Sequence, residues 1–397
     1  MQAKRLTMDC DYHDLTYIGR GGRRDLAYLF DNMAEARFHA TTFDCFWCGT
    51  ALYHSRRLPV FANSIGWKSA AGLAAVLREW DPLAVAVDLG RERDISVLPY
   101  FRLFEEAYAP FYGDAFFRAH PEYWWQTRCG MYRMVGWPCY SYEEVREHML
   151  GRLDDLVEHG VPGVLFGLSR THIPWLVAYR WGADGNCFGF NQPVVDEFRR
   201  RHGVDLSTFD HVEEVASADH SGYEFVYERR WVGAEPFDMW VFRRLMGEGL
   251  GLFLREARRR HPGLYIAIEC AQLPAGGRPD EPAAEAPFRI DLEGLCADGT
   301  IDEYAMSMNY RLGLLTEELL PRFQHVRESG KQLTAWLNDL FSPTGGGNER
   351  LGVTDVAAYV DRFLASGIDG AVVHEAAFLL ETEDPAAMWR EIGRLAR

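Results

Sequence analysis

The stretch Leu264-Tyr-Ile-Ala-Ile-Glu269 has the features of a short buried strand that ends in a carboxylate. A helical stretch at about 237–261 precedes it, and a loop rich in proline and glycine at 273–287 follows it. An apolar run of this length between a helix and a loop is typical of a parallel strand that is covered on both faces. The carboxylate at its end is the first candidate for a functional group.

Seven further runs of the same kind alternate with helical stretches along the chain. The eight predicted strands are Arg5–Asp11, Phe38–Trp47, Ile95–Phe101, Val164–Ser169, Leu264–Glu269, Glu303–Asn309, Gln332–Asn338 and Gly370–His374. Eight β–α units in 397 residues predict an α/β fold of the (β/α)8 TIM-barrel type. We expect one barrel domain over residues 1–397. A doubly wound open sheet is the alternative, although it would normally contain fewer strands.

The longest interruptions of this pattern come after strands. Insertions at about 102–140 and 170–235 follow the third and fourth predicted strands. In TIM barrels the loops at the C-terminal ends of the strands carry the functional residues, so we expect the site at that end. Two local signals fit the predicted helices: Asp81-Pro-Leu reads as an N-cap with proline in the first turn, and Ser141-Tyr-Glu-Glu144 reads as a capping box.

The composition disfavours several classes of partner. The formal net charge is −16, whereas binding to phosphate backbones or anionic membrane surfaces needs a basic face. No run of about 18 apolar residues predicts a membrane span, and no apolar segment at the N-terminus predicts a signal peptide. The eight cysteines are therefore expected to be free thiols in a reducing cytoplasm. We expect no cofactor and no nucleic-acid or membrane partner.

Three segments carry a resemblance to a known group of proteins. They are Gly189-Phe-Asn-Gln-Pro, which continues into a helix ending at Arg-His-Gly-Val-Asp205; Leu52-Tyr-His-Ser-Arg-Arg-Leu-Pro59; and Met308-Asn-Tyr310. In these segments the sequence resembles bacterial glycoside-hydrolase-like TIM barrels. The resemblance implies a barrel that handles sugars. One position departs from the group: Gly167 stands where an aspartate is common, three residues before Arg170.

Glycoside hydrolysis usually needs two carboxyl groups, one to protonate the leaving oxygen and one to attack or to activate water. Glu269 is the leading candidate, because it ends an apolar strand whose surroundings would favour an acid. Asp339 and Glu375 follow the seventh and eighth predicted strands and are the candidate partners. Asp11 and Asp44 are weaker candidates for the catalytic pair.

Other residues near the strand ends or in the insertions would bind the substrate. Polar groups would bind sugar hydroxyls, and aromatic faces would stack on the apolar faces of sugar rings. The candidates are Asp44, Tyr100, Arg102, Trp124, Trp125, Arg170, His172, Asn309, Tyr310, Trp336 and His374. The tryptophans have an equally simple interpretation, since most of them would pack the insertions onto the barrel.

Two alternatives remain open from the sequence. The glycine at position 167 motivates a sugar-binding barrel without catalysis. The segment Asp9-Cys-Asp-Tyr-His13, with His172 and His374 at other strand ends, motivates a metal-dependent hydrolase that uses Asp11, His13 and neighbouring residues, although the preferred hypothesis contains no metal. Trp231 and Trp240 would mark a contact in a homo-oligomer or belong to the core.

Overall fold

The computed structural model describes most of the chain. The described residues are 4–64, 66–68, 70–104, 114–126, 128, 130, 133–168, 188–206, 212–215, 228–231, 239–270, 288–306, 320–337, 352–374 and 376–396.

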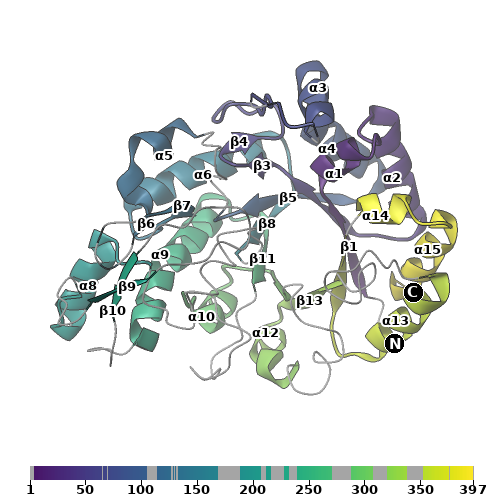
Figure 1. Ribbon diagram of the computed structural model, residues 1–397. Helices are drawn as coiled ribbons and strands as arrows, with labels where there is room; N and C mark the ends of the chain where they lie inside the picture. The colour runs from purple at the N-terminus through teal and green to yellow at the C-terminus, as the bar shows by residue number, and fades with distance from the viewer. Residues whose placement is uncertain are drawn as a thin grey trace.

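Eight parallel strands form a closed barrel at the centre of the molecule (Figure 1). They are β1 (Arg5–Cys10), β2 (Ala40–Asp44), β5 (Ser96–Arg102), β8 (Gly163–Gly167), β11 (Tyr265–Cys270), β12 (Glu303–Met306), β13 (Gln332–Leu337) and β14 (Gly370–His374). Each strand pairs with the next one along the chain, and β14 pairs with β1 to close the barrel. All eight overlap the predicted strands. The predicted TIM-barrel fold is confirmed, and the open sheet is excluded.

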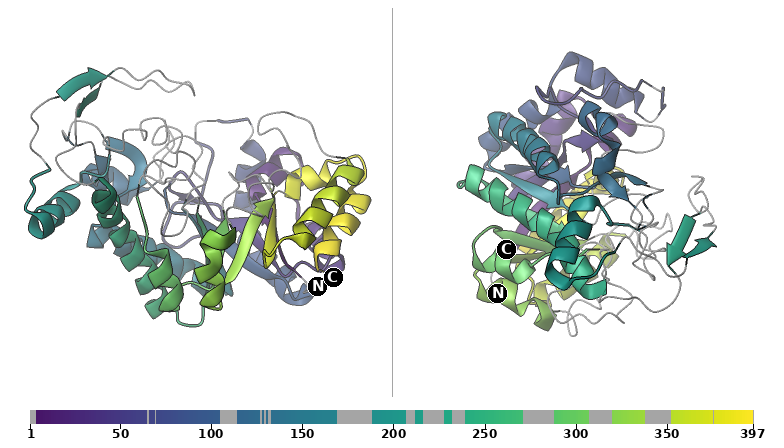
Figure 2. Two further views of the ribbon diagram at one scale, coloured as in Figure 1. Left: turned by 90° about the horizontal axis from the view of Figure 1, so that it is seen from below. Right: turned by 90° about the vertical axis from the view of Figure 1, so that its left-hand side faces the viewer.

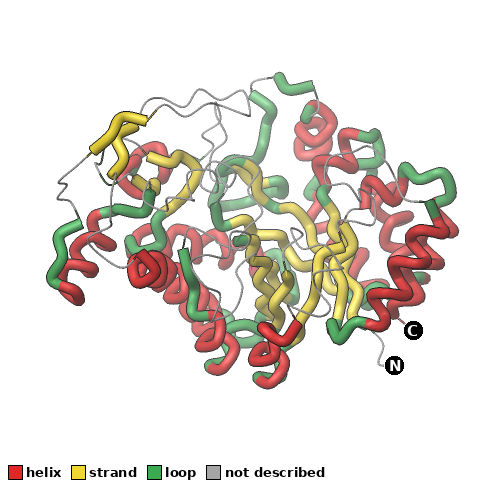
Figure 3. The backbone as a smooth tube through the Cα atoms, turned by 60° about the horizontal axis from the view of Figure 1, so that its bottom comes forward, coloured by secondary structure: helices red, strands yellow, loops and turns green. Residues whose placement is uncertain are grey.

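Helices surround the strands, as Figure 3 shows with the strands in yellow inside a shell of red helices. The helices are α1 (Tyr12–Tyr17), α2 (Arg23–Glu35), α3 (Ala71–Glu79), α4 (Pro82–Arg93), α6 (Glu143–Glu158), α9 (Met239–Arg260), α10 (Leu292–Ala297), α12 (Gln324–Glu328), α13 (Val353–Ala365), α14 (Ala376–Leu380) and α15 (Pro385–Ile392). Short 3-10 turns lie at η4 (Leu320–Phe323) and η6 (Gly393–Ala396).

The N-termini of α4 and α6 test the two predicted capping signals. Asp81 caps α4 by accepting hydrogen bonds from the backbone N–H groups of Leu83 and Ala84, as predicted. The prediction of a capping box at Ser141 is wrong. The N-cap of α6 is Tyr142, one residue later, and its side chain makes no capping hydrogen bond. The helix is held instead by a buried face that includes Val145, Met149 and Leu153, and packing of this kind overrides a missing cap.

The interior of the barrel is filled in layers. The middle layer contains Tyr100, Leu165, Ala267, Ala305, Trp336 and Val372, which come from six different strands. Small residues in this layer make room for the two large rings, whose centroids lie 5.8 Å apart. The barrel is therefore a packed core, and open space for a ligand can exist only beyond the strand ends.

The two long insertions contain elements of their own. Between β5 and α6 lie α5 (Ala115–Ala119), η1 (Pro121–Tyr123), β6 (Trp124–Gln126) and β7 (Arg133–Pro138). Between β8 and α9 lie α8 (Gln192–His202), β9 (Val212–Val215) and β10 (Glu228–Trp231). A smaller hairpin, β3 (Phe46–Trp47) with β4 (Thr50–Ala51), follows β2.

The two ends of the described chain lie side by side (Figure 2). The backbone N–H of Lys4 donates to the carbonyl of Leu395 at 3.0 Å. None of the helices in the described part of the chain is both long enough and apolar enough to span a membrane.

Candidate active site

Polar side chains from four neighbouring strands meet at the C-terminal end of the barrel. We call Asp9, Asp11, Asp44, Arg102 and His374 the mouth cluster. They lie on or directly after β1, β2, β5 and β14. In the strand pairing Asp9 lies opposite His374 and Asp44 opposite Tyr100, so these residues share the inner face of the barrel.

Arg102 is bound between two carboxylates. Its Nη2 donates to Asp44 Oδ2 at 2.7 Å and lies 3.6 Å from Asp11 Oδ2. Both Arg102 and Asp44 are buried. The guanidinium carbon also lies 5.3 Å from the centroid of the Tyr100 ring. A buried charge requires this kind of compensation, because desolvation without a partner is costly. The predicted residues Asp44, Tyr100 and Arg102 are thus brought together.

The same crowding gives Asp44 an unusual acidity. Burial raises the pKa of Asp44 well above its ordinary value, and the carboxylates of Asp11 and Asp9 raise it further, although Arg102 acts in the opposite direction. The pKa stays raised because Asp44 is buried and three carboxylates face one guanidinium within the described cluster. A hydrogen bond between the carboxyl groups of Asp44 and Asp11 also raises the pKa of Asp44.

Asp9 and His374 form the second contact of the cluster. His374 Nδ1 lies 2.5 Å from Asp9 Oδ2, and the Thr42 hydroxyl donates to Asp9 Oδ1 at 2.7 Å. Asp9 is only 1% exposed. The imidazole also packs near Trp336 and Phe378, with ring centroids 6.1 Å and 5.9 Å away. Asp9 therefore fixes the orientation of the ring.

Glu269 lies on the opposite side of the barrel mouth and is fully buried. The hydroxyl of Tyr100 lies 3.5 Å from Glu269 Oε2, at the long limit of a hydrogen bond. Gly167, on the strand between them, explains how Tyr100 reaches this position. A Cβ atom at residue 167 would lie 2.6 Å from the Tyr100 hydroxyl. The tyrosine ring thus occupies the space that a side chain on β8 would need.

Trp336 connects the two sides of the mouth. Its ring packs against Tyr100, which neighbours Glu269, and lies near His374. The indole is 2% exposed. Trp336 belongs to the packed layer of the barrel interior, so it lies beneath the polar groups of the mouth.

Several predicted site residues lie outside the described residues. They are Arg170, His172, Asn309, Tyr310, Asp339 and Glu375. The side chains of Trp231 and Trp240 are also outside the described part, so the predicted role of these tryptophans in a homo-oligomer stays a prediction.

Trp124 and Trp125 lie in the aromatic core of the first insertion. Trp124 stacks on Phe117 at 4.5 Å, and Trp125 packs against Phe104 and Trp137. They are 3% and 4% exposed. This placement favours packing over stacking on a sugar, and their part in substrate binding stays a prediction.

The sequence analysis places Asp9 only in the segment of the metal alternative and not among the candidates for the catalytic pair or for substrate binding. Asp9 lies inside β1, whereas those candidate carboxylates lie at strand ends. A usable signal was present: Thr7, Asp9 and Asp11 alternate with Leu6, Met8 and Cys10. Polar residues at every second position of a buried strand indicate an inner face that carries function.

The segments that carry the family resemblance have structural roles in the described residues. The buried Asn191 donates to the carbonyl oxygens of Glu122 and Trp124, and so joins the second insertion to the first. Tyr53 and Ser55 both donate to Asp155 Oδ2, which anchors the loop after β2 to α6. These segments therefore hold the scaffold around the mouth.

Asp11, His13 and Asp14 bring three possible metal ligands together at the start of α1. One potential ligand atom from each lies within 4.8 Å of the others. Asp11, however, already acts as the N-cap of α1, accepting hydrogen bonds from the backbone N–H groups of His13 and Asp14. Helix capping explains the proximity, and we assign no metal to this group.

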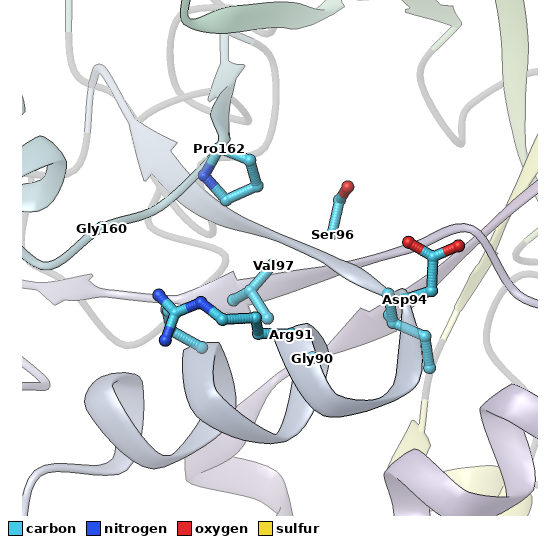
Figure 4. Close-up of a pocket in the computed structure, with 9 residues that line it drawn as sticks. Gly90, Arg91, Asp94, Ser96, Val97, Gly160 and Pro162 are labelled. Atoms are coloured by element: carbon cyan, nitrogen blue, oxygen red, sulfur yellow. The ribbon is translucent and has the colours of Figure 1, made fainter.

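A cavity of about 220 Å³ lies at the other end of the barrel (Figure 4). It is lined by residues at the end of α4, the start of β5 and the turn before β8, including Arg91, Asp94, Ser96 and Pro162. Since barrel enzymes react at the C-terminal ends of their strands, this cavity is separate from the candidate site.

Comparison with known proteins shows the fold. No protein-family model matches the sequence, and no curated protein matches it. Alpha-L-fucosidase isoenzyme 2 from Paenibacillus thiaminolyticus matches the whole chain with a TM-score of 0.54 and 11% identity, over 49% of its own length. The catalytic domain of beta-amylase from Paenibacillus polymyxa matches with a TM-score of 0.52 and 10% identity, over 100% of both chains.

The glycoside hydrolase domain of PgaB from Bordetella bronchiseptica matches with a TM-score of 0.52 and 12% identity, over 98% of this chain and 99% of that domain. This chain spans about half the length of the fucosidase and nearly all of the other two. These solved structures are glycoside hydrolases with a TIM-barrel fold. At such low identity the likeness establishes the barrel fold and leaves the chemistry to the site itself.

Proposed function

We propose that this protein is a glycoside hydrolase that cleaves a glycosidic bond in an oligosaccharide or polysaccharide. The observation that carries the proposal is the position of Glu269. It is a fully buried carboxyl at the C-terminal end of a barrel strand, and it shares the inner face with the mouth cluster. A carboxyl in such surroundings suits the donation of a proton to a leaving oxygen.

The neighbouring groups support a sugar as substrate. Arg102 and Asp44 would bind hydroxyl groups, while Tyr100 and Trp336, which are buried in the layer below, would hold these polar groups in place. Asp339 and Glu375 remain proposed partners of Glu269 because each follows a barrel strand. Cys45, Cys139 and Cys296 are buried free thiols, which supports a reducing cytoplasm as the place of action.

A product assay tests the proposal. Purified protein is incubated with a panel of oligosaccharides and glycoconjugates, and new masses are sought by mass spectrometry. We expect one class of sugar to be shortened. In Glu269→Gln the turnover should fall by about 10²- to 10⁴-fold, because general acid catalysis contributes roughly that factor.

The matched control is Glu303→Gln. Glu303 is a buried glutamate on the adjacent strand, but it lies at the N-terminal end of the barrel. The folded fraction of Glu303→Gln should have the same turnover as the wild type. Saccharide binding without any product across the panel would support the binding barrel instead, and equal turnover in Glu269→Gln would contradict the role of Glu269.

A further inference from the structure

We propose that Asp9 and His374 supply the second catalytic function of the site, with His374 as the base that activates water and Asp9 as its positioning residue. The inference rests on the proposed glycosidase function and deepens it. Its basis is the contact between a buried carboxylate and a histidine at the barrel mouth, at 2.5 Å.

The contact determines which ring nitrogen of His374 carries the proton. An ionised carboxylate only accepts hydrogen bonds, so the proton of the neutral imidazole lies on Nδ1, which donates to Asp9 Oδ2. Nε2 then carries the lone pair. Thr42 donates to the other oxygen of Asp9 at 2.7 Å and holds the carboxylate in place. A base oriented by a third group is the arrangement that activates nucleophiles in many hydrolases.

The location of His374 matches that of a base acting opposite Glu269. Glu269 lies on β11 and His374 on β14, with two strands between them in the closed barrel. Trp336 comes from one of these intervening strands, and contacts lead from His374 through Trp336 and Tyr100 to Glu269. A sugar resting above the indole would have the two groups on opposite sides. An acid and a base separated by a substrate and a water are the requirement for single displacement.

The proposed step conserves atoms and charge. His374 Nε2 takes a proton from water while the water oxygen forms a bond to the anomeric carbon. The bond from that carbon to the glycosidic oxygen breaks, and its electron pair goes to the leaving oxygen, which receives the proton of the Glu269 carboxyl. The products are two sugars, an imidazolium and a carboxylate. Solvent then takes the proton from His374 and returns one to Glu269.

The surroundings of His374 make Asp9 the group that tunes it. Within the described residues, the packed neighbours are Asp9 from β1, Trp336 from β13 and Phe378 from α14. Asp9 is the charged member of this set, and Thr42 reaches the imidazole through Asp9. A change at Asp9 is therefore expected to act on the histidine directly.

The activity test uses a sugar shortened in the product assay. We expect His374→Gln to lower kcat by about 10²- to 10⁴-fold, the range for removal of a general base. His374→Ala should regain activity when free imidazole is added, because the added base fills the vacated space. The matched control is His261→Gln. His261 Nε2 lies 2.8 Å from Asp154, so it is a second Asp–His pair, on the outer helices. Its variant should retain wild-type turnover and show no response to imidazole.

A second measurement does not depend on turnover. The ¹⁵N shifts of the imidazoles are recorded above the pH at which the rings are charged, and the His374 signal is identified by its loss in His374→Gln. We expect the proton on Nδ1 in the wild type and a mixture of the two neutral forms in Asp9→Asn. A proton on Nε2 in the wild type would overturn the proposal, since that nitrogen could not accept another.

The two tests separate this proposal from the broader one. Wild-type cleavage that persists within threefold in His374→Gln would overturn the role of His374 and leave the glycosidase proposal intact. Loss of cleavage in Glu375→Gln together with normal cleavage in His374→Gln would assign the base to the neighbouring carboxylate. Absence of cleavage by the wild type would count against the glycosidase function itself, and the ¹⁵N shifts would then decide the geometry of the pair.

Discussion

The two ends of the barrel use buried polar groups in opposite ways. At the N-terminal end, Arg5, Tyr265, Glu303, Gln332 and Thr334 form one network. Arg5 donates to Tyr265 and Gln332, while Tyr265 and Thr334 donate to the two oxygens of Glu303 at 2.7 and 2.6 Å. One positive and one negative charge are present, and each charged group has partners.

The mouth cluster at the other end is crowded with negative charge. Asp9, Asp11 and Asp44 face Arg102 and His374, and burial with neighbouring carboxylates raises the pKa of Asp44. The comparison fits an N-terminal end that contributes stability and a C-terminal end that carries the proposed chemistry. Barrel enzymes are generally built in this way, and functional sites often retain strain that the rest of the fold offsets.

The largest effect on stability is expected from breaking the N-terminal network. Glu303→Ala removes the shorter acceptor of the half-buried Tyr265 hydroxyl and the acceptor of the buried Thr334 hydroxyl. Hydrogen bonds to a charged group contribute about 1.5–3 kcal/mol each, so we expect a loss of about 3 kcal/mol or more. Denaturant unfolding measures it, with Glu158→Gln on the exposed surface as the control. A loss below about 1 kcal/mol would show that this end is no more optimised than the mouth.

An intermediate effect is expected from filling the space beside Tyr100. Gly167→Ala places a Cβ 2.6 Å from the Tyr100 hydroxyl, so the ring or the strand must shift. Overpacking of this kind costs about 1–3 kcal/mol. Tyr100→Leu removes all three of the nearest atoms, which are the hydroxyl and two ring carbons at 2.6, 2.7 and 2.8 Å. The double variant should therefore lose less stability than the sum of the two single variants, which a thermal or denaturant cycle measures. If the losses of stability in the two single variants simply added up in the double variant, the position of the Tyr100 ring would not depend on Gly167.

The smallest effect concerns the pH dependence of the mouth. Because the pKa of Asp44 is raised in the folded protein, the fold keeps a proton that the unfolded chain loses above about pH 4. The contribution of Asp44 to the free energy of unfolding is fully present below that pH and decreases as the pH rises. Asp44→Asn cannot lose the proton, and its amide oxygen still accepts from Arg102.

We therefore expect Asp44→Asn and the wild type to be similar in stability near pH 4. At pH 5 the variant should be more stable by on the order of 1 kcal/mol. Asp81→Asn is a useful contrast, because hydrogen bonds from His159 and from backbone N–H groups outweigh burial and lower the pKa of Asp81. Asp81→Asn should therefore lower the free energy of unfolding above about pH 4, where the Asp81 carboxylate is ionised and contributes stability. If the free energies of unfolding of Asp44→Asn and the wild type changed with pH in parallel, Asp44 would be ionised in the folded protein at pH 5.

Much of the fold was readable from local patterns. Each of the eight strands is an apolar run between a helix and a loop, and such runs are short-range features of the chain. Glu269, Asp44, Tyr100 and Arg102 were predicted for a related reason: polar groups at the ends of buried strands need a function or a partner. The capping box at Ser141 failed because the packing of α6 decides where that helix begins.

The sequence by itself determined the periodic units, the buried strands and the residue types available at their ends. Only the tertiary structure decided which of those residues meet. Asp9 and His374 are 365 positions apart and become neighbours because β14 pairs with β1 to close the barrel. Tyr100 reaches Glu269 because the intervening strand carries no side chain at Gly167. Contacts of this kind depend on strand register and barrel closure, which are properties of the whole chain and of no single segment.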